Sequence, residues 1–330
     1  MKTDQWKSRR AHGANKKPRK NVLHGIAIAL ASTAVSFLIS ACGKLELVDK
    51  YFFTACAGDG PEPDTEFDID LPPLDMESFY QELATFEDHY LSTPLARVTY
   101  QQQSYPIFRL QPKHAKQDTT KPKLLIVVGI HGNERAALLA LPRILSEFDP
   151  LTSQWQVAII APANPVGAQY GSRYNGDGCD INRDFNQMKT TEAQAIANVI
   201  DNWQPDLIVA LHEGPQQGFF LIATHQVDNA FSQQILASLQ KQNIDFANKS
   251  FLGLSLGQPG LSKEGSFIST MKDLLALGSL GTYGDSLTIG TITTESDWHS
   301  KDHEARIQGH VATVLSILAT PYPKRNTHQR

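Results

Sequence analysis

Cysteine is scarce throughout this sequence, and basic residues are scarce after residue 20. Only three cysteines occur among 330 residues, too few for a disulfide-rich scaffold. The first twenty residues contain eight Lys and Arg against one Asp, whereas the remainder contains 22 basic and 33 acidic residues. Nucleic-acid binding needs a clustered basic surface, so the acidic body argues against nucleic acid as the main partner. With 41% hydrophobic and 19% charged residues, the composition is otherwise that of a globular protein.

Residues 21–41, directly after the basic stretch, contain no Asp, Glu, Lys or Arg. A basic segment followed by an apolar one is typical of a signal peptide. The apolar run ends in LISAC (38–42), which resembles a bacterial lipobox. The resemblance implies cleavage before Cys42 and lipidation of that cysteine, whose acyl chains would anchor the protein in a membrane. The alternative is an uncleaved signal anchor, because the run is just long enough to span a bilayer as a helix.

Four segments of the chain differ in composition. We expect a lipoprotein signal peptide over 1–41, an acidic flexible tether over 42–74, a folded domain over 75–320 and a polar tail over 321–330. Gly43 is not the aspartate that retains such lipoproteins at the inner membrane. The sequence therefore predicts an exported, membrane-anchored lipoprotein facing the periplasm, with outer-membrane sorting favoured.

Apolar runs and helical periodicity alternate along the folded domain. Strands are expected at 96–101, 106–110, 124–130, 155–162, 206–212, 218–224 and 286–294, and helices at 75–91, 134–148, 191–203, 228–241 and 302–318. This order predicts an α/β fold with a mixed, mostly parallel sheet flanked by helices on both faces. Residues 242–285 give the weakest pattern.

Ionisable residues follow three of the expected strands. His131 follows the apolar run LLIVVGI, His212 follows DLIVAL, and Glu295 follows TIGTITT. In open α/β sheets, ligands bind outside the carboxyl ends of the strands. We therefore expect these three side chains to converge on one pocket.

The segment His131-Gly132-Asn133-Glu134 places an imidazole and a carboxylate three residues apart at a strand-to-helix turn. Gly132 would let the backbone turn tightly between them. With His212, the set has two imidazoles and one carboxylate, which leaves the fourth tetrahedral position of a zinc ion open. Nitrogen and oxygen ligands of this kind suit Zn²⁺. A single histidine would more often be structural, so the prediction depends on the combination.

A polar loop, SRYNGDGCDINRDF (172–185), carries Arg173, Asp180, Asn182 and Arg183. A guanidinium can bind a carboxylate through two parallel hydrogen bonds, and an arginine near a metal can stabilise an oxyanion. The same composition also fits a solvated turn.

Five motifs occur in a fixed order: GIHGNERA, NPVG, R-x-N-x-x-G-x-D-I-N-R-D-F, LHEG and ITTE. Together they resemble the zinc carboxypeptidases of the carboxypeptidase A family over roughly residues 122–320. The bacterial murein peptide amidase branch is most similar, and the succinylglutamate desuccinylase/aspartoacylase group is related. The resemblance implies a zinc carboxypeptidase-like catalytic domain.

The resemblance also assigns roles to individual residues. His131, Glu134 and His212 would bind one Zn²⁺. Glu295 would be the general base that takes a proton from the attacking water and then protonates the leaving amine. Arg173 would polarise the scissile carbonyl and stabilise the oxyanion.

Further residues of the resemblance concern the substrate. Asn182 and Arg183 would hold its terminal carboxylate, and Asp180 would orient His131 from behind. Tyr283 lies near the position of a mobile, substrate-covering tyrosine. Leu280 falls where the family lines its specificity pocket.

Three functions are compatible with these residues. The first is an exported zinc metallocarboxypeptidase or amidase that hydrolyses the C-terminal amide bond of short peptides with a free carboxylate, such as peptidoglycan stem peptides, although the murein amidase itself is cytoplasmic. The second is an N-acyl amino acid deacylase of the desuccinylase/aspartoacylase type; such enzymes usually continue into another β domain, whereas 35 residues follow Glu295 here. The third is a catalytically inactive peptide-binding lipoprotein, against which the intact Glu295 argues.

Cys56 and Cys179 are the two thiols that remain if Cys42 is lipidated. In an oxidising compartment they could pair and tie the tether to the carboxylate-binding loop. Alternatively, Cys179 packs beside Asp180 as a free thiol.

Overall fold

The computed structural model of the protein describes residues 56, 60–61, 74–113, 120–250, 253, 255–263 and 278–322. These residues belong to one unit that spans Phe52–Arg330. The predicted signal peptide, Cys42 and most of the predicted tether and polar tail lie outside the described residues. Among the described helices, none is both long and apolar enough to cross a membrane.

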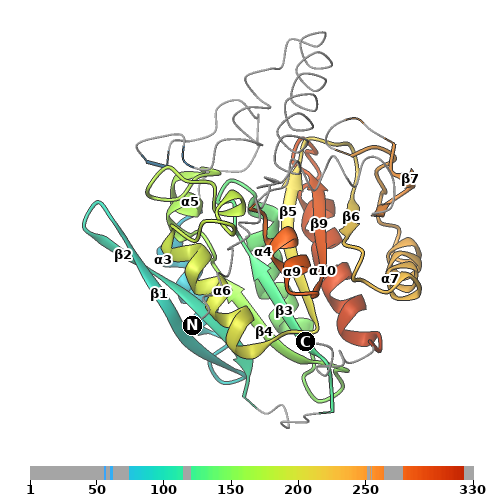
Figure 1. The fold of residues 1–330 in the computed structure, drawn as a ribbon, viewed down its shortest axis with the longest axis horizontal. Coiled ribbons are helices and arrows are strands. Elements are labelled where there is room, and N and C mark those ends of the chain that lie inside the picture. Colours follow the sequence, from blue (N-terminus) through green and yellow to red (C-terminus); the bar gives the residue numbers. More distant parts are fainter. Residues whose placement is uncertain are drawn as a thin grey trace, which may run out of the picture. The chain divides into compact units, whose positions relative to one another are not determined.

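A nine-stranded sheet runs through the described part of the domain, in the order β1-β2-β4-β3-β5-β9-β6-β8-β7 (Figure 1). Its strands are β1 (Tyr90–Tyr100), β2 (Gln103–Pro112), β3 (Lys123–Val128), β4 (Gln156–Ala161), β5 (Leu207–Gly214), β6 (Phe220–Ala223), β7 (Gly257–Gln258), β8 (Leu261–Lys263) and β9 (Gly290–Asp297). The central strands β4, β3, β5 and β9 are parallel, and antiparallel pairs extend the sheet on both sides. The predicted mixed α/β fold is confirmed.

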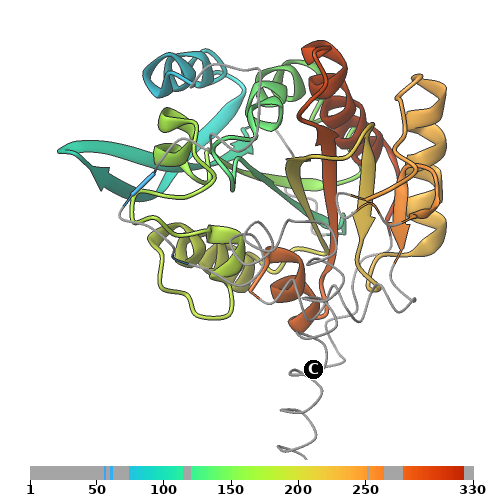
Figure 2. The same ribbon diagram turned by 90° about the horizontal axis from the view of Figure 1, so that it is seen from above.

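Helices cover both faces of this sheet (Figure 2). They are α3 (Met76–Ala84), α4 (Arg135–Glu147), α5 (Pro165–Tyr170), α6 (Thr191–Trp203), α7 (Asn229–Lys241), α9 (Leu280–Ser286) and α10 (His303–Ala319), with a short 3₁₀ helix η2 (Ile181–Arg183). Side chains of α3, α4, α7 and α10 pack in one apolar core, whereas those of α6 and α9 pack in a second core on the opposite face. Polar N-caps start most of these helices; for example, the Thr190 hydroxyl accepts the Ala193 amide at the start of α6.

The two cores explain why the central strands read as unbroken apolar runs. In β3, Leu124 and Ile126 face the α4 and α10 side, and Leu125 and Val127 face the α6 and α9 side. A strand that is covered on both faces must be apolar at every position.

Several boundaries differ from the sequence expectation. The helix expected over 75–91 ends at Ala84, β1 begins at Tyr90 rather than at 96, and the strands beside the predicted site residues do not all end where their apolar runs end. β3 ends at Val128, and Gly129, with φ of 77°, turns the chain before His131. In contrast, β5 and β9 continue through His212 and Glu295 because these two strands pair as far as Gly214 and Asp297. His131 therefore follows a strand, whereas His212 and Glu295 lie within one.

Candidate active site

Three side chains form a buried cluster at the carboxyl ends of β3 and β5: two come from the loop between β3 and α4, and the third comes from β5. Nδ1 of His131 lies 2.6 Å from Oε1 of Glu134, and Nδ1 of His212 lies 2.7 Å from Oε2 of the same carboxylate. The two Nδ1 atoms lie 3.2 Å apart. Each residue is at most 3% exposed, so the cluster is shielded from bulk water.

The pairing of β5 with β9 places Glu295 beside this cluster. His212 and Glu295 are register partners in two adjacent parallel strands, so their side chains project from the same face of the sheet. In β5, Ile208 and Ala210 belong to the α6 and α9 core, and the alternation of side chains directs His212 to that face too. The expected convergence of His131, His212 and Glu295 thus has a structural basis.

Gly132 is required by space rather than by its backbone angles. A Cβ atom at this position would lie 1.9 Å from the backbone carbon of Gly167 and 2.0 Å from the backbone nitrogen of Ala168. Because α5 passes this close, any side chain at position 132 would overlap its backbone. The physical reason therefore differs from the tight turn that the sequence suggests.

Asp180 connects the cluster to Arg173. Its Oδ1 lies 3.1 Å from Nε2 of His131, and its Oδ2 accepts a hydrogen bond of 2.9 Å from Nε of Arg173. Nη1 of Arg173 lies 3.2 Å from Nδ1 of His131 and 3.7 Å from Oε1 of Glu134. The structure thus brings Arg173 and Asp180 together with the predicted ligands, as the sequence-based roles require.

The electrostatics of the cluster favour charged carboxylates and a neutral imidazole. Burial would raise the pKa of Glu134, but His131 and His212 outweigh it and hold that pKa below its ordinary value. Burial would also raise the pKa of Asp180, but the interaction with Arg173, and to a smaller extent that with His131, lowers it. Burial lowers the pKa of His212. Metal ligands must be in these deprotonated states.

The donor set fits a tetrahedral zinc ion. The ligand atoms of His131, Glu134 and His212 all lie within 4.8 Å of one another. Zinc bonds of about 2.0–2.1 Å imply a separation of roughly 3.3 Å between neighbouring ligand atoms in a tetrahedron. The separation of 3.2 Å between the two Nδ1 atoms is close to that value, whereas the 2.6 and 2.7 Å from these atoms to the Glu134 oxygens are hydrogen-bond distances. Two imidazoles and one carboxylate would leave one coordination position for water or substrate.

Asn182 and Arg183 lie in η2, which Asp180 caps. Oδ1 of Asp180 accepts the Asn182 amide at 2.8 Å, and Oδ1 of Asn182 accepts the Leu280 amide at 2.9 Å. Nη1 of Arg183 donates to the Asn182 carbonyl at 2.7 Å, and burial lowers the pKa of this guanidinium. Leu280 is buried in the core shared with α6.

The structure does not bring the Tyr283 hydroxyl to the cluster. This hydroxyl donates to Oδ1 of Asp201 at 2.9 Å, and the ring stacks on Phe185 with centroids 5.9 Å apart. Asp201 belongs to the end of α6 that leads into the amino end of β5, whereas the cluster lies at the carboxyl end of that strand. A substrate-covering role would require Tyr283 to leave Asp201, and this role stays a prediction.

Cys56 and Cys179 form a disulfide bond, which resolves the two alternatives that the sequence leaves open. Cys179 directly precedes Asp180, so the bond attaches the chain at residue 56 to the loop that carries Arg173 and Asp180. Gly60 and Pro61 are buried as well. The described part of the predicted tether is therefore attached to the domain.

A buried polar network on the opposite face of β5 and β9 was not predicted. It comprises Glu213, Ser296, Arg306 and His310, and each is at most 2% exposed. The signal lies in the motifs LHEG and TTES, where a polar residue follows His212 and Glu295 inside an apolar strand. Alternation along a strand directs these neighbours away from the cluster.

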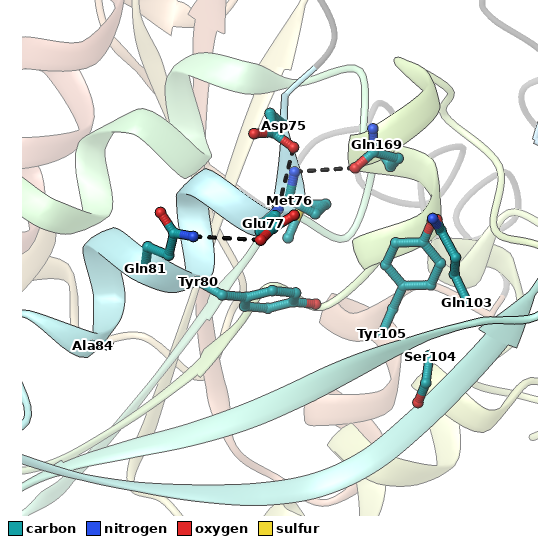
Figure 3. A pocket seen from close by; sticks show the side chains of 10 residues that line it. All are labelled: Asp75, Met76, Glu77, Tyr80, Gln81, Ala84, Gln103, Ser104, Tyr105 and Gln169. Atoms are coloured by element: carbon teal, nitrogen blue, oxygen red, sulfur yellow. Dashed lines mark hydrogen bonds between the residues drawn. The ribbon is translucent and has the colours of Figure 1, made fainter.

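A surface hollow of about 620 Å³ lies between α3, the β1–β2 hairpin and α5 (Figure 3). Its polar groups largely bind one another: the Tyr105 hydroxyl donates to Gln103, and Oε1 of Gln169 accepts the Met76 amide. None of the predicted site residues is among the residues that line it. The hollow is therefore distinct from the buried cluster.

Comparison with known protein families gives a match, which covers the segment that carries this cluster. Residues 120–257 match the family model of the succinylglutamate desuccinylase/aspartoacylase catalytic domain. This segment contains His131, Glu134 and His212 at the positions described above. The match covers less than half of the chain and agrees with the resemblance that its motifs carry. Comparison with curated protein sequences gives no match.

Solved structures show the same fold. A protein of Shewanella denitrificans OS217, described as a metallopeptidase, is 18% identical with a TM-score of 0.59, covering 80% of this chain and 97% of its own. The metallo-carboxypeptidase of Burkholderia cenocepacia is 15% identical with a TM-score of 0.50, covering 74% and 69%. The murein-tripeptide amidase MpaA of Escherichia coli O157 is 17% identical with a TM-score of 0.49, covering 71% and 93%. The likeness to the first two of these structures shows the fold and not the substrate.

Proposed function

We propose that this protein is an exported zinc metallocarboxypeptidase or amidase that hydrolyses the C-terminal amide bond of short peptides, with peptidoglycan stem peptides as the substrate class. The observation that carries the proposal is the buried cluster of His131, Glu134 and His212, beside which β9 places Glu295. A structural histidine pair would not need a second carboxylate in register beside it.

His131, Glu134 and His212 would hold the zinc ion, which supplies a Lewis acid at neutral pH. Glu295 would accept a proton from water as the water oxygen bonds to the carbonyl carbon of the substrate. Arg173, held by Asp180, would stabilise the negative charge that develops on the carbonyl oxygen. Glu295 would then return the proton to the leaving nitrogen as the C–N bond breaks, which completes the hydrolysis.

Asn182 and Arg183 would bind the carboxylate at the end of the substrate. Arg183 is held by the Asn182 carbonyl, and Asn182 is held by Asp180 and by the Leu280 amide. Asp180 also binds Arg173. One carboxylate would therefore position both the residue that binds the chain end, Asn182, and the residue that stabilises the oxyanion, Arg173. This arrangement favours a substrate with a free carboxylate close to the scissile bond.

An N-acyl amino acid deacylase is the second candidate. The observation in its favour is the match of residues 120–257 to the desuccinylase/aspartoacylase catalytic domain. Such a substrate also presents a carboxylate beside an amide bond, so the site described above would serve either reaction.

One substrate panel distinguishes the two candidates. The full-length protein in mild detergent is incubated with Ala-γ-Glu-diaminopimelate, ordinary peptides and N-acyl amino acids, with and without a zinc chelator, and the products are followed by mass spectrometry. We expect release of the C-terminal residue from peptides, and loss of this activity with the chelator. Cleavage of acyl amino acids alone would favour the deacylase. Zinc binding without turnover of any substrate would favour a binding protein.

The variant Glu295→Gln tests the assignment of the base. An amide cannot take the proton, so we expect kcat to fall about 10²–10⁴-fold while zinc affinity stays at the wild-type value. Glu77→Gln, the same change at an exposed carboxylate in the first turn of α3, is the control and should retain wild-type activity. Full activity in Glu295→Gln would refute the role of Glu295.

A further inference from the structure

We propose that Glu213 caps α4 from the neighbouring strand and thereby frees Glu134 to bind the metal. The inference rests on the proposed metal site and concerns a residue to which no role in that site was assigned. Glu213 directly follows the predicted ligand His212 and projects from the opposite face of β5, toward α4 and α10.

The start of α4 is the first observation. Glu134 occupies the N-cap position of this helix, yet its side chain makes no capping hydrogen bond. The other described helices, including η2, all receive such a bond from their own N-cap residue. The Glu134 carboxylate instead lies between His131 and His212.

The missing bond is supplied from outside the helix. An N-cap side chain normally accepts the amide of the second or third helical residue. Here Oε2 of Glu213 accepts the amide of Ala136, the second residue of α4, at 2.8 Å. A carboxylate at this end of a helix also benefits from the helix dipole. Glu213 therefore supplies the capping hydrogen bond that the N-cap residue of α4, Glu134, does not make.

Glu213 is itself fixed on its second oxygen. Oε1 accepts hydrogen bonds of 2.9 Å from Nε of Arg306 and 3.0 Å from the Ser296 hydroxyl, and Nη2 of Arg306 lies 2.8 Å away. Arg306 and Glu213 are both about 2% exposed. Ser296 directly follows Glu295, so the network adjoins the proposed base as well as two proposed ligands.

The inference makes Glu213 a positioning residue that acts through Glu134. If Glu213 is lost, the start of α4 lacks an acceptor, and the Glu134 carboxylate is drawn toward the helix and away from the imidazoles. Loss of a group that orients a metal ligand typically weakens metal binding about 10–100-fold. A residue that merely stabilised the fold would not depend on Glu134 for its effect.

A double-mutant cycle on the full-length protein tests this dependence. Zinc affinity is measured by chelator competition for the wild type, Glu213→Gln, Glu134→Ala and the double variant. In Glu213→Gln one of the two accepting oxygens becomes an NH2 donor, which cannot face the Arg306 guanidinium, so the remaining oxygen stays on Arg306 and the Ala136 amide loses its acceptor. We expect this variant to weaken zinc binding about 10–100-fold and to add nothing in the Glu134→Ala background. Cobalt substitution gives a second readout, because displacement of the Glu134 carboxylate would alter the visible absorption of bound Co²⁺.

The matched control is Glu304→Gln. Glu304 also bridges α10 to α4, through Arg143, but this ion pair is exposed and remote from the start of α4. Its zinc affinity should equal that of the wild type. If Glu213→Gln does not fold, Ser296→Ala removes one hydrogen bond to the same oxygen and should weaken zinc binding several-fold, again only when Glu134 is present.

The outcomes separate the inference from the proposed function. Wild-type zinc affinity in Glu213→Gln or in a folded Ser296→Ala, or additive losses in the double variant, would overturn the inference alone. Weakened zinc binding in Glu213→Gln with no hydrolysis of any substrate would overturn the function and support the inference. A wild-type protein that binds no zinc would refute both.

Discussion

Single residues in this protein are governed by burial more than by their local position in a helix. Glu192 lies in the first turn of α6, where a carboxylate usually gains about 0.3–1 kcal/mol from the helix dipole. It is fully buried, however, and Asn175 is its one described side-chain partner, at 3.1 Å. Burial raises the pKa of Glu192 to about 7 from an ordinary value of 4.5. Desolvation therefore outweighs the dipole.

This shift predicts a loss of stability as the pH rises. Between pH 4.5 and 7 the unfolded chain loses the Glu192 proton before the folded chain does, so the free energy of unfolding falls across this range. Glu192→Gln removes the effect and should be more stable than the wild type at pH 8, on the order of 2–3 kcal/mol, with little difference at pH 4.5. Thermal unfolding at both pH values measures it.

Glu77→Gln is the control for this prediction. Glu77 occupies the first turn of α3 but is exposed, so its substitution should shift the melting temperature little at either pH. Equal stabilisation of Glu192→Gln at pH 4.5 and pH 8 would contradict the ionisation argument.

Ionisable residues at the ends of apolar strands could be predicted from the sequence as site residues. Residues whose role depends on burial or on a contact distant in the sequence could not. His131, Glu134 and His212 stand out because an apolar strand has no other use for them. The burial of Glu192 is invisible in the sequence, because a helix beginning Thr-Thr-Glu is usually a solvated N-terminus. The role of Glu213 is likewise invisible in the sequence, because its bond to Ala136 joins positions 77 residues apart.

Secondary-structure elements set the geometry of the site through close contacts. Predictions for α4, α6, α7 and α10 agree with the structure to within about a residue or two at each end, because their apolar periodicity is regular and because polar N-cap residues mark the starts of α6, α7 and α10. The end of β9 was predicted less well. The expected strand over 286–294 actually begins at Gly290 and continues to Asp297, and α9 precedes it. Pairing with β5 carries β9 further than its apolar run indicates.

The contact between the His131–Glu134 loop and α5 predicts a severe effect of Gly132→Ala. The new methyl group would overlap the backbone of Gly167 and Ala168, which cannot rotate away as a side chain can. Overpacking of this kind costs about 3 kcal/mol or more, and the displaced loop should also weaken zinc binding. Chemical denaturation and chelator competition measure the two effects.

Gly281→Ala provides a matched comparison. A Cβ atom at Gly281, in α9, would lie 3.7 Å or more from its neighbours, which is ordinary contact. This variant should be neutral or slightly more stable, because alanine favours helix. Equal free energies of unfolding for Gly132→Ala and Gly281→Ala would show that the loop between His131 and Glu134 can move away from α5.

At the scale of the whole molecule, the disulfide changes what the predicted tether can do. The segment from Cys42 to the domain would span up to roughly 110 Å if it were extended as far as residue 74. The bond between Cys56 and Cys179 attaches the chain at residue 56, which leaves at most about 50 Å of extended chain after Cys42. A lipid-anchored enzyme of this kind would therefore work close to its membrane. The bond also supports the proposed export, since disulfides persist in oxidising compartments.

Cys42→Ala tests lipidation and export together. In the wild type we expect incorporation of labelled fatty acid and a mature chain that begins at residue 42, because acylation of that cysteine accompanies removal of residues 1–41. Cys42→Ala should carry no fatty acid and keep residues 1–41, yet still resist alkylation at Cys56 and Cys179 until it is reduced, since the disulfide depends on the compartment and not on the lipid. Intact-mass measurement with and without reduction detects the fatty acid, the position of the N-terminus and the disulfide. A wild-type chain that retains residues 1–41 without fatty acid would establish the signal anchor instead, and free thiols at both positions would argue against export.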